Sequence, residues 1–214
     1  MALTAAYRAP MQAFCHVTIP SIENRYRRLQ HFLFCGRQSL ALGLLPHCDT
    51  FLKAAITTIP DSAHAITDDE LLSFLASFSS FLVVVPGHPE HGPFFLSKGL
   101  LNVIRDYSWT TDGAGVQAYG CMISLFCTLA QRKSPYTVEG VEANDTLFAR
   151  DREYMDELQG VVDRLVDECV GQLPGIKQAA APLDLLNRLL ANAQMTPKCA
   201  LLAWELFGRP PSVY

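Results

Sequence analysis

The sequence predicts an all-α fold, an α-solenoid of stacked HEAT-like helical hairpins. Apolar residues recur at three- and four-residue steps through most of the 214 residues. Pro and Gly interrupt these stretches, and no segment alternates persuasively like a strand. The apolar stripes are also wide, which is typical of helices that contact neighbours on two sides. Residues 1–214 are therefore expected to form a single solenoid segment.

The N-terminal half contains six expected helical stretches. They span residues 3–17, 21–36, 37–45, 46–59, 67–85 and 93–107. Ser21 is the expected N-cap of the second stretch and Gly36 its end. Pro46 is expected to begin the fourth. Thr67 and Glu70 have the spacing of a capping box, in which each side chain satisfies a backbone N–H near the other residue.

The C-terminal half is expected to continue the helical pattern after a turn at residues 110–113. The expected helices span 116–129 and 154–173, followed by two that begin near Pro182 and Pro197, the last ending at Gly208. Between them, residues 133–149 are expected to form a long inter-helix loop, a kind of segment that is often functional. Asn144 or Asp145 is the expected cap of the helix that follows.

Composition excludes several classes of protein. Half of the residues are hydrophobic and 18% are charged, which excludes disorder. The formal net charge of −4 argues against a nucleic-acid partner, because phosphate neutralisation needs clustered Lys and Arg. The one basic cluster, Arg25, Arg27 and Arg28, is interpreted as a solvated helix face.

Cysteine usage and the terminal sequence favour a cytoplasmic protein. The seven cysteines are scattered without a CxxC pair, as small buried hydrophobes are in a reducing compartment. No signal peptide is expected, because Arg8 and Pro10 interrupt the N-terminal apolar residues. No membrane-spanning helix is expected either, since no stretch of about 20 predominantly apolar residues is present.

The sequence carries no motif of an enzyme: a nucleophile elbow, phosphate-binding loop and zinc-protease helix are all missing. His31 and Cys35 share a helix face but are interpreted as packing residues. His88, Glu90 and His91 occupy one turn, which leaves open a helical metal-dependent hydrolase as an alternative. No catalytic residue, metal or cofactor is predicted.

Two places could contact a partner protein. Tyr107 and Trp109 end one expected helix and serve either as packing anchors or as a partner contact. Leu147 and Phe148 are apolar residues in an otherwise polar loop, and either fold back on the core or face a partner.

Several separated segments, in order, resemble one family. They are AFC at 13–15 with IPS at 19–21, FLKAAI at 51–56, VVPGHPEHG at 84–92, GLLNVIRDYSW at 99–109 and VEANDTLF at 141–148. Over residues 6–173 the chain resembles the C-terminal region of the vacuolar protein sorting 35-like large subunit of the Retriever complex, and more distantly the retromer large subunit.

The resemblance implies a non-enzymatic scaffold of an endosomal cargo-recycling complex. It implies that the chain cradles a small metallophosphoesterase-fold subunit like vacuolar protein sorting 29, together with other Retriever and Commander subunits. The expected location is cytoplasmic and peripheral on endosomes, with membrane association only through the complex. The chain is then either a fragment or a truncated relative. The expected partner-binding residues are Tyr107, Trp109, Asn144, Asp145, Leu147 and Phe148. A generic helical-repeat adaptor outside trafficking is the other alternative.

Overall fold

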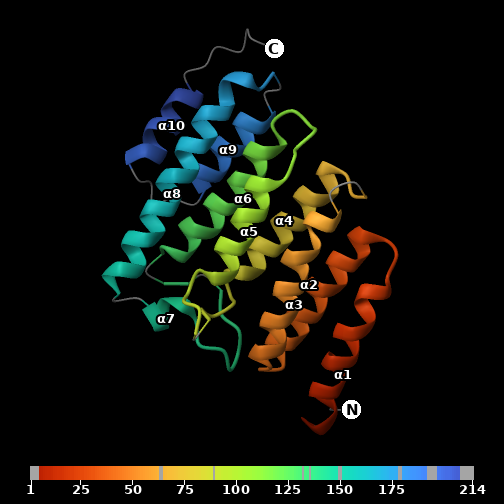
Figure 1. Cartoon of the computed structure of the whole chain (residues 1–214). Helices are drawn as coiled ribbons and strands as arrows, with labels where there is room; N and C mark the ends of the chain where they lie inside the picture. Colours follow the sequence, from red (N-terminus) through yellow and green to blue (C-terminus); the bar gives the residue numbers. More distant parts are fainter. Residues whose placement is uncertain are drawn as a thin grey trace. The chain divides into compact units, whose positions relative to one another are not determined.

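The computed structural model describes an all-α protein (Figure 1). It describes residues 5–62, 65–88, 90–131, 133–134, 136–148, 151–177, 180–191 and 197–207. Within these residues there are ten α-helices, three short 3₁₀ segments and no strand beyond one isolated bridge between His88 and Gly92. The predicted all-α helical fold is confirmed. None of the described helices is long and apolar enough to cross a bilayer.

The helices form two compact units, drawn from Met1–Tyr107 with Thr137–Ala143 and from Ser108–Tyr136 with Asn144–Tyr214. The N-terminal unit contains α1 (Ala5–Thr18), α2 (Arg25–Ala41), α3 (Leu45–Thr58), α4 (Asp68–Leu82) and α5 (Phe95–Asp106). In this unit α2 and α3 pair most extensively, while α4 packs on α2 and α5 packs on α3. Its core is rich in phenylalanine: Phe32 and Phe51 are buried between α2 and α3, and Phe74 and Phe78 on α4.

The C-terminal unit is built around α6. It contains α6 (Ala114–Leu129), α7 (Asn144–Phe148), α8 (Arg152–Gln172), α9 (Ala180–Ala191) and α10 (Pro197–Phe207). Helix α6 packs on both α8 and α9, and α10 packs on the same two helices. Because α6 is covered on two sides, most of its residues are buried. Arg188 of α9 lies close to Gly120 of α6: a Cβ there would be 2.9 Å from its Cδ, so the flexible arginine side chain would have to shift.

The start of α2 corrects one predicted cap. Ser21 belongs to the 3₁₀ segment η1 (Ile19–Ser21), and its hydroxyl donates to the carbonyl of Thr18 instead. Asn24 is the N-cap, because its Oδ1 accepts the backbone N–H of Arg27 at 2.8 Å. The prediction of Ser21 was therefore wrong by three residues: an intervening turn ends before the helix begins.

The predicted break at Gly36 is also wrong, since α2 continues through it to Ala41. The separate helix expected over residues 37–45 is consequently the last part of α2. Gly36 is buried against α3, where a Cβ would lie 3.2 Å from Cδ2 of Leu52. This glycine lets two helices approach closely and does not terminate one.

Two further boundaries differ from the prediction, while the capping box is confirmed. Thr67 and Glu70 form both reciprocal contacts at the start of α4. However, α4 ends at Leu82, and residues 83–85 form a turn ahead of Pro86, whose ring disfavours helix in the preceding residue. The N-cap of α8 is Asp151, whose Oδ1 accepts the backbone N–H groups of Glu153 and Tyr154. The prediction that Asn144 or Asp145 would cap this helix was therefore wrong.

The predicted loop over residues 133–149 contains the one-turn helix α7. Its last position, like the expected end of the chain's last helix at Gly208, lies outside the described residues.

Candidate functional site

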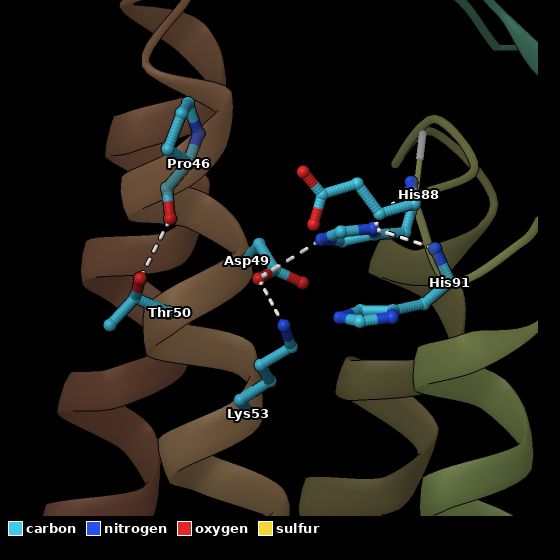
Figure 2. Close-up of polar contacts among 7 residues, drawn as sticks. Pro46, Asp49, Thr50, Lys53, His88 and His91 are labelled. Carbon is cyan, nitrogen blue, oxygen red and sulfur yellow. Dashed lines mark hydrogen bonds and ion pairs between the residues drawn. The ribbon is translucent and has the colours of Figure 1, made fainter.

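Residues 86–88 and 90–92 belong to a turn, here called the histidine turn, that is tied together by the His88 side chain (Figure 2). Nδ1 of His88 accepts the backbone N–H groups of Glu90 and His91, each at 3.1 Å. Gly92 closes the turn with a backbone hydrogen bond to the His88 carbonyl and has a φ of 85°. Because Nδ1 accepts two hydrogen bonds, the neutral form of the His88 imidazole carries its proton on Nε2.

The first turns of α3 supply the charged neighbours of this imidazole. Oδ2 of Asp49 lies 2.7 Å from Nζ of Lys53 and 3.8 Å from Nε2 of His88 (Figure 2). The Asp49–Lys53 pair has i,i+4 spacing on one helix. The contact to His88 is longer than a hydrogen bond. Asp49 therefore forms its ion pair within α3 and only approaches the histidine turn.

Stacked rings complete the packing of the turn onto α5. The imidazole of His91 stacks on that of His88, with centroids 4.4 Å apart and planes 23° from parallel. The ring of Phe95, at the start of α5, lies 4.6 Å from the His91 ring and 4.7 Å below Nζ of Lys53. Aromatic contacts thus hold the histidine pair against Phe95, whose ring also forms a cation–π contact with Lys53.

An open cavity of about 540 Å³ lies between this turn and the start of α3. Leu45, Pro46 and Leu96 contribute apolar wall, while Asp49 and Glu90 contribute carboxylates. Cys48 also lines it, but burial, followed by the nearby Asp49, raises the pKa of this thiol to about 12. The thiol is therefore neutral at physiological pH and is not an activated nucleophile.

The metal-dependent hydrolase alternative gains no support from this geometry. The described part of the chain holds no group of three or more His, Cys, Asp and Glu side chains that could bind a metal ion. Nδ1 of His88 is occupied by two backbone donors. His31 is exposed whereas Cys35 is buried, so this i,i+4 pair does not present two ligands to one space.

Tyr107 and Trp109 are both partly withdrawn from solvent. Tyr107 is buried, and its pKa is raised by that burial and then by the neighbouring Asp68. Trp109 is half-buried against α6, where a Cβ added to Gly115 would lie 3.3 Å from Cδ1 of the indole. Packing within the protein thus accounts for most of the burial of the Tyr107 and Trp109 rings.

Helix α7 separates its residues into packed and accessible ones. Asn144 is buried, and Oδ2 of Asp145 accepts the backbone N–H of Ser134 at 2.8 Å. The ring of Phe148 stacks on that of Tyr154, with centroids 4.9 Å apart and planes 10° from parallel. Leu147, with 41% of its surface exposed, remains available to another molecule.

Sequence reasoning missed Asp49, Lys53 and Phe95 as neighbours of the histidine turn. The i,i+4 charge pair on α3 was visible in the sequence. Its proximity to residues almost forty positions later was not, because that contact depends on how α3 and α5 pack.

Comparison with known proteins identifies the family. Residues 2–209 match the family described as the VPS35L C-terminal domain. The chain belongs to this family. Among similar proteins, a "VPS35 endosomal protein sorting factor-like" protein of Dictyostelium discoideum is 33% identical over 223 aligned positions, which cover 96% of this chain and 23% of that protein. The human counterpart is 32% identical, and the alignment covers 90% of this chain. The Drosophila melanogaster counterpart is 26% identical over 86% of this chain. The chain spans less than a quarter of the length of these relatives.

Proposed function

We propose that this chain is a non-enzymatic scaffold of an endosomal protein-sorting complex. The observation that carries the proposal is membership of the VPS35L C-terminal domain family over residues 2–209, whose relatives are described as endosomal sorting factors. The family-level resemblance extends the proposal to a Retriever-like, cargo-recycling complex with other Retriever and Commander subunits. The chain then resides in the cytoplasm, peripheral on endosomes, and reaches the membrane through the complex.

The physical character of the chain supports a scaffolding role. Stacked helices with buried apolar faces form a stiff surface that holds a partner without large rearrangement. Six of the seven cysteines are buried. The histidine turn is likewise occupied by its own hydrogen bonds and ring contacts. These features suit protein binding better than turnover of a substrate.

The partner proposed here is a small metallophosphoesterase-fold subunit like vacuolar protein sorting 29. Of the six partner-binding residues expected from the sequence, Leu147 offers the most accessible apolar side chain. The neighbouring Phe148 stacks on Tyr154, and Asp145 holds the preceding segment through the backbone N–H of Ser134. Leu147 therefore protrudes from a supported helix, which is the situation of an interface anchor.

The test is a binding measurement with the vacuolar protein sorting 29 subunit. Wild-type chain should bind it, and Leu147→Asp should weaken binding tenfold or more, equivalent to about 1.4 kcal/mol. Because Leu147 is exposed, the melting temperature should change little. Leu183→Asp is the matched control: Leu183 is an exposed leucine of α9 and its replacement should leave affinity unchanged.

Three results would count against the proposal. Absence of binding by the wild-type chain would contradict the proposed partner. A collapse of melting temperature in Leu147→Asp would assign this residue to packing. Unchanged affinity would move the interface elsewhere, with the histidine turn as the next candidate.

A further inference from the structure

A groove of about 450 Å³ runs between α2 and α4 in the N-terminal unit. It is here called the α2–α4 groove, and none of its lining residues belongs to the histidine turn or to α7. Its principal lining residues are Tyr26, His31, Phe34 and Arg37 on α2, and Phe74 and Ser77 on α4. No described lining residue is an aspartate or a glutamate, although the chain as a whole carries a net charge of −4.

The groove has an apolar floor and one protruding aromatic ring. Leu33 and Phe74 are buried beneath it. Phe34 stands at its side with 57% of its surface exposed. A phenylalanine so placed on a helix can contact an apolar side chain of another molecule without rearrangement.

Arg37 is held beside this ring by neutral groups. Its Nη2 donates to the backbone carbonyl of Ser77 at 3.0 Å, which links α2 to α4. Its guanidinium carbon lies 5.7 Å from the centroid of Phe81. Among the described residues no carboxylate lies within ion-pair distance of Arg37, so none of these residues forms an ion pair with its guanidinium. A planar guanidinium with free donors is suited to a carboxylate ligand.

The opposite wall leaves room for such a ligand. Ser73 and Ser77 on α4 are small, neutral and exposed. Exposed Arg27 and His31 on α2 extend the stripe that contains Phe34 and Arg37. The surface therefore combines an apolar anchor with positive charge and lacks negative charge along its described lining.

We propose that the α2–α4 groove docks an acidic amphipathic segment of a partner protein. An apolar side chain of that segment packs on Phe34, and an aspartate or glutamate carboxylate pairs with Arg37. The charge complementarity between this groove and a carboxylate-rich segment carries the inference. The groove shares no residue with the proposed phosphoesterase interface, so the two proposals can fail independently.

The test uses a synthetic amphipathic peptide of about twelve residues, with leucines at helical spacing and glutamates elsewhere. Titration into ¹⁵N-labelled chain should give saturable shifts at residues of α2 and α4. Arg37→Gln should weaken binding about five- to tenfold, and raising the salt concentration from about 50 to 500 mM should weaken it further. Phe34→Ser should also weaken binding.

The matched control is Arg164→Gln. Arg164 is an exposed arginine of α8 that donates to Gly160 of its own helix, so its loss should not alter affinity. A peptide with glutamine in place of glutamate should bind at least fivefold more weakly. The proposal is overturned if the acidic peptide does not saturate, if the glutamine peptide binds equally well, if Arg37→Gln binds like wild type, or if only a phosphoserine version binds.

Discussion

At the scale of single residues, two glycines with positive φ have different surroundings. Gly113 precedes α6 with a φ of 77°, and a Cβ added there would lie 2.6 Å from Cβ of Ala181. Gly140 has a φ of 76°, but a Cβ added there would meet nothing within 4 Å. Gly113 is therefore constrained by both backbone conformation and the approach of α9, whereas Gly140 is constrained by conformation alone.

Gly113→Ala should consequently destabilise the protein more than Gly140→Ala. The left-handed conformation costs a non-glycine residue about 1–2 kcal/mol at either site. At Gly113 the contact with Ala181 must also be relieved by a backbone shift, so we expect a total loss of about 2–4 kcal/mol. Urea unfolding of both variants measures the difference. Equal losses of unfolding free energy in the two variants would show that α9 shifts away from residue 113 with no energetic penalty.

At the scale of helices, the boundaries depend on which polar side chain satisfies the first free N–H groups. Asn24 does so for α2 and Asp151 for α8. Ser21 resembles a cap in sequence but is used in the preceding 3₁₀ turn. The choice between two eligible caps follows from where the connecting turn ends.

Alanine substitutions at Asn24 and Ser21 should show which of the two residues caps α2. Asn24→Ala removes the acceptor for the Arg27 N–H and should cost about 1 kcal/mol of the free energy of unfolding. Ser21→Ala removes an exposed hydroxyl contact to the Thr18 carbonyl and should cost under about 0.5 kcal/mol. Chemical denaturation of both variants provides the measurement, and a larger loss at Ser21 would contradict the assigned cap.

Helix periodicity made the fold class predictable, and local chemistry made the Thr67–Glu70 capping box predictable. Gly36 shows where this reasoning stops. Its usual role as a helix terminator is overridden because its missing side chain admits Leu52 of α3. Such a role depends on a neighbour that is distant in sequence, so local propensity favoured the wrong boundary.

The sequence indicated which segments could form the candidate sites, but not which side chains contact one another there. The sequence singled out the histidine turn and the 144–148 segment, but not Asp49 beside His88 or the stacking of Phe148 on Tyr154. It also gave no sign of the α2–α4 groove, where the lining residues alternate with core positions of two helices. Contacts between elements determine which side chains remain accessible, and periodicity alone does not supply them.

At the scale of the whole molecule, both units bury groups that are neutral near pH 7 but ionise in alkali. Burial raises the pKa of Cys48 in the N-terminal unit, and of Cys127 and Cys169 in the C-terminal unit, from 9.0 to about 12. Burial likewise raises the pKa of Tyr154 from 10.0 to about 12. In the unfolded chain these groups return to their ordinary values and release protons at lower pH.

The protein should therefore lose stability as pH rises above about 9. Below that pH the four groups are protonated in both states and favour neither. Between about 9 and 12 the unfolded chain binds fewer protons than the folded one, so each fully shifted group lowers the free energy of unfolding by up to about 1.4 kcal/mol per pH unit. Urea unfolding at several values from pH 7.5 to 10.5, in the presence of a reductant, should show a plateau followed by a decline. Replacing Cys48, Cys127 and Cys169 with alanine should lower the plateau and make the decline shallower, because the tyrosine then remains as the main contributor among these groups. A wild-type curve that stays level to pH 10.5 would contradict the burial of these thiols, since their ionisation is what links unfolding to proton release.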